Sequence, residues 1–104
     1  MGTIDRQKLA LGLRAEHELF LQLHPESHKL HEKAGRSLLG GVPMLWMMRW
    51  AGGFPIFAAQ AADAHFTDVD GNHYVDFCLG DTGAMTGHSP APVVAPVSPR
   101  QKST

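Results

Sequence analysis

Apolar residues recur at helical spacing near the start of the chain, between Thr3 and Leu23. The apolar positions of this stretch are Ile4, Leu9, Leu11, Leu13, Leu19, Phe20 and Leu23. Their spacing predicts an amphipathic helix, and Thr3 is its expected N-cap. The helix should end at His24, because a residue that precedes a proline disfavours the helical region of backbone space.

A second helix is expected to begin at Pro25, since the first turn of a helix tolerates the missing N–H group of proline. We predict that it covers about Glu26 to Leu39 and that Gly40 and Gly41 end it. The two helices together would form an amino-terminal helical segment.

The next residues, up to Pro55, form an irregular and strongly apolar connector. Its most apolar run is Met44 to Trp50, here called the Trp/Met segment, in which Arg49 is the only charged residue. Side chains of this kind are poorly suited to water, so the segment either packs against a core or forms an interface. The sequence leaves both alternatives open.

Three strand-like runs follow, at Ile56–Ala62, His65–Val69 and His73–Cys78. Asp70-Gly71-Asn72 separates the last two, and an Asp-Gly pair between strand formers favours a tight hairpin, because glycine accepts the positive φ that such turns need. The sequence therefore predicts a small antiparallel three-stranded meander after the helices, which is an α+β fold.

The last part of the chain, from Gly80 onward, is rich in glycine and proline. Its prolines at positions 90, 92, 96 and 99 predict that no stable long helix forms there. The polar end, Arg100 to Thr104, is expected to be disordered. Four segments result: a helical segment (1–39), a Trp/Met-rich connector (40–55), a meander (56–79) and a Gly/Pro-rich crossing with its tail (80–104).

Composition limits the classes of function. A chain of 104 residues is one domain or a piece of one. Nine basic residues against ten acidic ones give a net charge of -1, which offers no electrostatic reason to expect nucleic acid. Charged residues interrupt every apolar run, so neither a secretory signal nor a membrane helix is predicted. With Cys78 as the single cysteine, the chain fits a reducing cytoplasm.

Two short patterns resemble metal sites. His17, His24, His28 and His31 would line one face of a continuous helix, as metal ligands do, but Pro25 interrupts that helix and no HExxH is present. We interpret these histidines as solvent-exposed helix residues. Asp68-x-Asp70-Gly71 resembles the start of a calcium loop, but the later oxygen ligands are missing, so a hairpin turn is predicted instead.

Neither the glycines nor the cysteine indicates catalysis. Gly80, Gly83 and Gly87 match no nucleotide-binding motif and are expected to allow tight bends. Cys78 lies in a predicted strand without an activating neighbour in sequence, which predicts a buried structural thiol rather than a nucleophile.

Four motifs, in order, give the chain a specific resemblance. They are Gly40-Gly41-Val42, then Gly52-Gly53-Phe54-Pro55-Ile56-Phe57, then Phe66-Thr67-Asp68-Val69-Asp70-Gly71-Asn72-His73-Tyr74-Val75-Asp76-Phe77, and then Gly87-His88-Ser89-Pro90. This series resembles the amino-terminal part of class III pyridoxal-phosphate-dependent aminotransferases, and within them the branch of glutamate-1-semialdehyde aminomutase.

The resemblance implies the fold-type-I architecture, in which a large α/β domain holds the cofactor and both chain ends build a smaller domain. It also implies a homodimer and an amino-acid substrate. Pyridoxal phosphate forms a Schiff base with a lysine. None of the four lysines here, Lys8, Lys29, Lys33 and Lys102, matches the family's catalytic lysine, so the resemblance implies no cofactor-binding or catalytic residue within this chain.

The resemblance does imply residues near the substrate. Gly80 to His88 resembles the stretch that follows the meander and borders the active site, which makes Asp81, Thr82 and Gly83 the candidate substrate-proximal residues. The aminomutase branch has Ser-Trp-Gly at these three positions, so the departure favours a transaminase over an aminomutase. Asp63 stands where relatives often have glycine, and Asp tolerates a left-handed turn better than most residues.

The sequence therefore predicts the amino-terminal part of a transaminase that is inactive alone. The alternatives are a part of an aminomutase-type isomerase and a stand-alone interaction module that uses the Trp/Met segment. The residues after Pro90 are unlike the helix that relatives enter at this point, which we interpret as a truncated or frameshifted reading frame.

Overall fold

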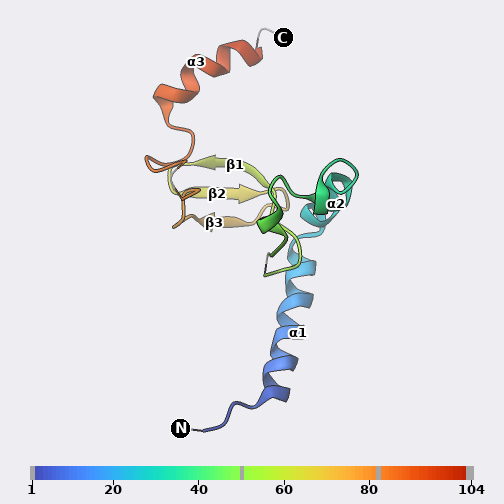
Figure 1. Cartoon of the computed structure of the whole chain (residues 1–104). Helices are drawn as coiled ribbons and strands as arrows, with labels where there is room; N and C mark the ends of the chain where they lie inside the picture. The colour runs from blue at the N-terminus through green and yellow to red at the C-terminus, as the bar shows by residue number, and fades with distance from the viewer. Residues whose placement is uncertain (1, 50, 82, 103–104) are drawn as a thin grey trace. The chain divides into compact units, whose positions relative to one another are not determined.

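The computed structural model of the chain describes residues 2–49, 51–81 and 83–102, with side chains through residue 97. It divides into two compact units, Met1–Phe57 and Ala58–Thr104. The first contains α1 (Arg6–Leu23), α2 (Pro25–Ala34) and the 3-10 helices η1 (Leu39–Gly41) and η2 (Leu45–Arg49). The second contains β1 (Ala58–Ala62), β2 (His65–Asp68), β3 (His73–Val75) and α3 (Ala91–Lys102), as Figure 1 shows.

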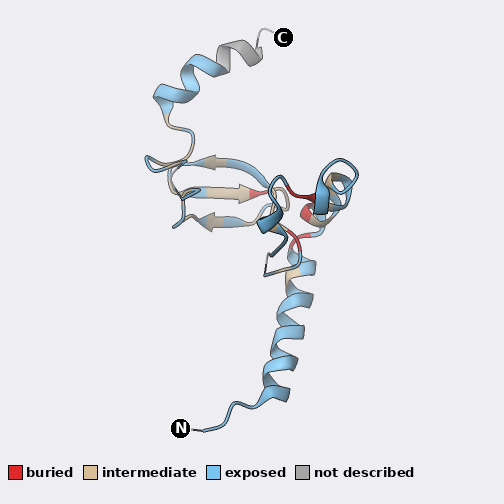
Figure 2. Ribbon diagram, in the orientation of Figure 1, coloured by how far each residue is buried: buried red, intermediate tan, exposed pale blue. Residues whose placement is uncertain are grey.

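The helix α1 begins later than the sequence predicted. Its N-cap is Asp5 rather than Thr3, because the carboxylate of Asp5 accepts a 3.1 Å hydrogen bond from the backbone N–H of Lys8. A cap of this kind contributes about 1 kcal/mol to helix stability. No residue of α1 is buried, and its apolar positions are exposed along most of its length (Figure 2).

The helix α2 begins at Pro25 as predicted but ends at Ala34, five residues before the predicted Leu39. The residue after Ala34 is Gly35, whose N–H bonds to the carbonyl of His31, and the following turn tightens into bonds of the 3-10 type. The chain is extended again at Leu38, with φ of -119°. The earlier glycine therefore ends the helix, and Gly40 and Gly41 belong to η1.

The core of the first unit forms around Phe54, which is buried. The Phe20 ring lies 4.9 Å from the Phe54 ring, and the His28 ring stacks on Phe54 at 4.7 Å. His24 is also buried, and its Nδ1 lies 2.8 Å from the carbonyl oxygen of Phe20. The predicted exposure holds for His17 but is wrong for the other three histidines. His24 packs on Phe20, with 4.3 Å between the rings, and His28 and His31 are half-buried beside Phe54.

The Trp/Met segment is largely exposed. Trp46 has 60% of its surface exposed and its Nε1–H donates to the Sδ of Met44 at 3.3 Å. Leu45 and Met48 are also exposed, whereas Met47 is half-buried, and Trp50 lies outside the described residues. Packing within the chain therefore leaves most of this apolar surface uncovered, which favours the interface alternative.

The three strands form the antiparallel meander that the sequence predicted, in the order β1-β2-β3. β1 pairs with β2 from Ala62↔His65 to Ala58↔Asp68, with an irregularity between Ala58 and Gln60. β2 pairs with β3 at His65↔Val75, Phe66↔Tyr74 and Thr67↔His73. The Phe66 and Tyr74 rings stack at 4.6 Å on one face of the sheet.

The turn between β2 and β3 is built around Asp68, which is 1% exposed. Its carboxylate accepts hydrogen bonds from the backbone N–H groups of Asp70 and Asn72, from the side-chain amide of Asn72 and from the hydroxyl of Tyr74. Gly71 has a φ of 88°, as a tight turn requires. The hairpin turn is confirmed.

Residues Ala91–Lys102 form the helix α3, which the sequence did not predict. The prediction that prolines exclude a long helix here was wrong. The expected disorder of Arg100 to Thr104 stays a prediction. Pro90 and Pro92 lie at the start of α3, where a missing N–H group costs nothing, and the Pro90 carbonyl accepts from Val93 and Val94. Pro96 and Pro99 each remove one hydrogen bond without ending the helix.

None of the helices in the described ranges has the length and apolar character needed to cross a membrane.

Candidate functional site

The segment that follows β3 begins at Asp76, whose carboxylate organises it. Oδ1 of Asp76 accepts hydrogen bonds from the backbone N–H groups of Cys78 at 2.9 Å and of Leu79 at 2.8 Å. The N–H of Asp76 itself bonds to the carbonyl of Ala64 at 2.7 Å. The side chain of Asp76 bonds to the backbone here, and bonds of this kind compete with the hydrogen bonds of a sheet. This explains why β3 ends at Val75 and not at the predicted Cys78.

The same segment ends at His88, whose side chain contacts that of Asp76. Nε2 of His88 lies 2.7 Å from Oδ2 of Asp76, and both side chains are half-buried. The backbone of His88 also pairs with Asp63, through N–H···O bonds of 2.7 and 2.9 Å in the two directions. Residues 77–87 are therefore a loop whose two ends are joined, here called the clamped loop.

Two further contacts hold the end of the clamped loop against β1 and the turn that follows it. Ser89 Oγ donates to the carbonyl of Ala61 at 2.6 Å. Gly87 has a φ of 94°, and a Cβ built there would lie 3.1 Å from the Cα of Asp63. Glycine is required at this position both for its backbone conformation and for the close approach. Asp63 has a φ of 53°, in agreement with its predicted left-handed turn.

The clamped loop contains an unusual backbone turn. Leu79, Gly80 and Asp81 all have left-handed conformations, with φ of 51°, 65° and 61°. A non-glycine residue in this region costs of order 1–3 kcal/mol and persists only where its surroundings fix it. Here the Asp76 carboxylate holds the N–H of Leu79, and the N–H of Asp81 bonds to the Cys78 carbonyl at 3.0 Å.

The predicted substrate-proximal residues lie in this loop. Asp81 is exposed, and its Oδ1 accepts from the Cys78 thiol at 3.2 Å. Gly83 is exposed as well, and its N–H bonds to the carbonyl of Gly80 at 3.1 Å. Thr82 lies outside the described residues. Sequence reasoning gave no role to Asp76 and His88, although Tyr-x-Asp and Gly-His were the signals that could have indicated them.

Cys78 is exposed, contrary to the prediction of a buried structural thiol. The prediction was wrong because it depended on a strand through residue 78, whereas the Asp76 side chain ends β3 three residues earlier.

The carboxylate of Asp76 is stabilised in its ionised form. The hydrogen bond to His88 holds the pKa of Asp76 below its ordinary value, and the N–H groups of Leu79 and Cys78 add to this effect. In the hairpin turn, burial alone would raise the pKa of Asp68, but its hydrogen bonds from Asn72, Tyr74 and Asp70 outweigh the burial and lower it. Burial, followed by the bond to Asp68, raises the pKa of Tyr74 to about 12.

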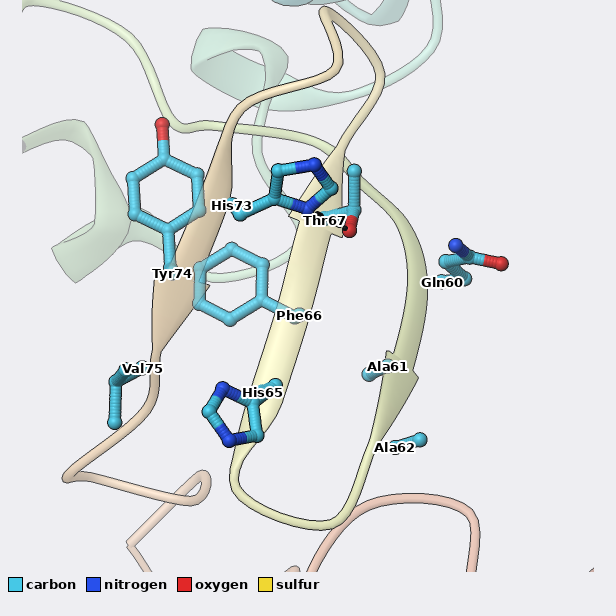
Figure 3. A pocket seen from close by; sticks show the side chains of 9 residues that line it. All are labelled: Gln60, Ala61, Ala62, His65, Phe66, Thr67, His73, Tyr74 and Val75. Carbon is cyan, nitrogen blue, oxygen red and sulfur yellow. Dashed lines mark hydrogen bonds between the residues drawn. The ribbon is translucent and has the colours of Figure 1, made fainter.

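A hollow of about 570 Å³ lies on the sheet of the same unit (Figure 3). Its polar contact joins Oγ1 of Thr67 to Nδ1 of His73 at 2.9 Å. It is lined by Gln60, Ala61, Ala62, His65, Phe66, Thr67, His73, Tyr74 and Val75. None of the predicted site residues is among them, so the hollow and the clamped loop are different places on this unit.

The described residues do not fit pyridoxal phosphate. Its reactive lysine must lie in a setting that makes the amine nucleophilic, such as an apolar pocket. Lys8, Lys29 and Lys33 are exposed, and Nζ of Lys29 pairs with Glu26 at 3.0 Å. Over the part of the chain with described side chains, no cluster of His, Cys, Asp or Glu could hold a metal ion either.

The chain is similar to known proteins over most of its length. Glutamate-1-semialdehyde 2,1-aminomutase of Methanocaldococcus jannaschii is 36% identical over 72 residues, which are 69% of this chain and 16% of that protein. No established family profile matches the chain.

Solved structures extend the similarity to the fold. A glutamate-1-semialdehyde aminomutase from Pseudomonas aeruginosa PAO1 matches 97% of this chain with a TM-score of 0.80 and 35% identity. A variant of it, solved in complex with PMP, matches 96% of this chain with the same TM-score of 0.80 and the same 35% identity. A β-phenylalanine aminotransferase from Variovorax paradoxus shares the fold over 90% of the chain, with a TM-score of 0.75 and 23% identity.

The chain spans about a fifth of the length of these solved structures: 22% of the Pseudomonas protein and 21% of the Variovorax protein. The matched part contains the helices, the meander and the clamped loop. By sequence and by fold, the chain matches a fragment of the class III, fold-type-I pyridoxal-phosphate-dependent aminotransferases, and its similarity is to glutamate-1-semialdehyde aminomutases.

Proposed function

We propose that the chain serves as the amino-terminal part of a pyridoxal-phosphate-dependent transaminase, which moves an amino group between an amino acid and an oxo acid or aldehyde. The observation that carries this proposal is the match of 97% of the chain to the Pseudomonas aminomutase structure with a TM-score of 0.80. The cofactor and the catalytic lysine would come from the large domain, because the lysines described here are exposed.

Within that enzyme, Asp81, Thr82 and Gly83 would lie next to the substrate. Asp81 and Gly83 are exposed on a loop whose ends are fixed, which suits a contact with a bound molecule. A homodimer is part of the proposal, and the exposed apolar surface of Trp46 and its neighbours supports it. The exposed, unpaired thiol of Cys78 fits a cytoplasmic location.

An isomerase of the aminomutase type is the second candidate. The two most similar relatives described above, with 36% and 35% identity, are both glutamate-1-semialdehyde aminomutases. Against it stands the Asp81-Thr82-Gly83 sequence, which departs from the Ser-Trp-Gly of that branch. The two candidates differ in substrate: the transaminase converts a separate amino donor, and the isomerase converts glutamate-1-semialdehyde itself.

Complementation in trans tests the proposal. The Pseudomonas aminomutase is produced without its matched amino-terminal region and mixed with this chain and pyridoxal phosphate. We expect the chain to restore amino-group transfer, measured by the change in cofactor absorbance when an amino donor is added. The aminomutase's own amino-terminal region, supplied in trans, is the positive control. A Gly87→Val chain is the matched negative control, because its side chain would collide with Asp63.

The outcomes separate the candidates. The substrate range is compared with that of the positive control. Turnover of amino donors that the positive control does not convert supports the transaminase, and the same substrate range as the positive control supports the isomerase. If the positive control is active but this chain restores neither reaction, both are wrong and the chain is better explained as an interaction module.

A further inference from the structure

We propose that Asp76 and His88 are positioning residues that hold Asp81 and Gly83 of the clamped loop in place for the substrate. The inference rests on the proposed function in one respect only, the placement of Asp81 and Gly83 near substrate. The contact between Asp76 and His88, here called the clamp, is argued from the geometry of the second unit alone.

The clamp uses both oxygens of one carboxylate for two different tasks. Oδ1 of Asp76 fixes the start of the loop, through the N–H groups of Cys78 and Leu79. Oδ2 fixes its end, through Nε2 of His88 at 2.7 Å. A single side chain therefore sets the distance between the two ends, and removing it frees both.

Without the bonds from Asp76, the backbone of the clamped loop would not keep its observed conformation. Leu79 and Asp81 are non-glycine residues with φ of 51° and 61°, on either side of Gly80. A residue in this conformation returns to ordinary backbone space when its surroundings no longer fix it. Asp81 would then lose its orientation, because its place depends on the turn that Asp76 begins.

The fold of the meander does not depend on this contact. His88 is joined to Asp63 by two backbone hydrogen bonds, which its side chain does not make. Ser89 adds a bond from its Oγ to the Ala61 carbonyl. A His88→Ala chain should therefore keep its sheet and lose only the imidazole contact to Asp76.

His88→Gln provides the matched conservative variant. Its side-chain amide can still donate a hydrogen bond to Oδ2 of Asp76, without the imidazole ring. If the contact is what matters, this variant should preserve the loop, whereas His88→Ala should not.

The first measurement is hydrogen–deuterium exchange of peptides from the 104-residue chain. We expect exchange in residues 77–87 to rise about three- to tenfold in His88→Ala and further in Asp76→Ala, with residues 58–75 unchanged. His88→Gln should stay close to the unmodified chain. Unchanged exchange in the loop of both alanine variants would overturn the clamp.

The second measurement is steady-state kinetics of the complemented enzyme. His88→Ala should raise KM for the amino donor about tenfold and change kcat by less than about threefold, because a loosened loop weakens substrate binding more than the chemical step. His88→Gln should restore KM. If both variants fold and the loop exchanges faster while KM is unchanged, Asp76 and His88 are structural only. If the unmodified chain restores no activity, the proposed function fails, and the exchange data still decide on the clamp.

Discussion

The hydroxyl of Tyr74 donates a 2.8 Å hydrogen bond to the buried carboxylate of Asp68 and so joins β3 to the turn that precedes it. Burial raises the pKa of Tyr74 to about 12, and the bond to Asp68 adds to this effect, because ionisation of Tyr74 would place two negative charges side by side. Tyr74 is the only tyrosine of the chain, so its titration can be followed without assignment.

We predict that the phenol absorbance of the folded chain titrates near pH 12, instead of near 10 as in an unfolded peptide. Because the folded pKa is raised, this group stabilises the fold fully below about pH 10 and loses its contribution as pH rises through 12. Asp68→Asn should move the midpoint down toward 10, since it removes the negative charge. A midpoint near 10 in the unmodified chain would contradict the hydrogen bond.

Acid should loosen the clamped loop. The pKa of Asp76 is lowered in the folded chain, so its contribution to stability is present above its unfolded pKa of about 3.9 and is lost as pH falls through the folded value. We expect hydrogen exchange in residues 77–87 to accelerate below about pH 4, after correction for the intrinsic rate. Asp76→Asn, which removes the ionisable carboxylate, should reduce the pH dependence of the exchange. Part of this pH dependence should remain, because the pKa of Asp68 is lowered too.

Gly87 should tolerate no side chain. With φ of 94° and the backbone of Asp63 within 3.3 Å of a Cβ, Gly87→Ala should destabilise the second unit by about 1–3 kcal/mol. The matched control is Gly12→Ala in the interior of α1, where nothing lies within 4 Å. That change should stabilise α1 by about 0.5–1 kcal/mol, because alanine is the better helix former. Urea denaturation monitored by circular dichroism measures both.

Local patterns predicted the first two helices and the meander, because each depends on spacing within a few residues. Two errors arose where a side chain bonded to the backbone nearby. Asp5 rather than Thr3 capped α1, and Asp76 ended β3 early. Such bonds compete with regular structure at short range, and sequence alone offers several residues that could make them.

Contacts between distant residues could not be predicted at all. Nothing in the sequence pairs His88 with Asp76, and nothing predicts that the His28 ring stacks on Phe54 at 4.7 Å. The candidate loop was found only through its resemblance to a family, which gave Asp81 and Gly83 but not the pair that holds them. The proline spacing led to the opposite error at α3, where a helix formed although none was predicted, since Pro90 and Pro92 stand at its start, where a helix tolerates proline.

The chain alone should form no specific Schiff base with pyridoxal phosphate. Lys8, Lys29 and Lys33 are exposed, so none of them lies in a pocket that could hold the cofactor and make the amine nucleophilic. We expect borohydride reduction followed by mass spectrometry to show weak labelling spread over several lysines. The unmodified Pseudomonas aminomutase, treated in parallel, is the control for trapping. Stoichiometric labelling of one lysine in this chain would show that it holds the cofactor by itself.

The Trp/Met segment should make the isolated chain self-associate. Trp46, Leu45 and Met48 are exposed on or beside η2, and apolar surface gains about 25 cal/mol for each Å² that it removes from water. A small chain has too little interior to bury these side chains, so they are expected to pack against another molecule. Light scattering on the unmodified chain should therefore show species larger than a monomer at high concentration.

Substitution distinguishes this segment from apolar exposure in general. Trp46→Ser combined with Trp50→Ser should reduce the size of the scattering species and raise solubility. Ile4→Ser is the matched control, since Ile4 is 74% exposed but lies outside the segment, ahead of α1. If Ile4→Ser disperses the chain as effectively as the tryptophan variant, association follows from total apolar exposure and the segment has no special part in it. A monodisperse monomer of the unmodified chain would mean that this surface needs no cover, and the argument that the segment packs against a partner in the whole enzyme would lose its main physical support.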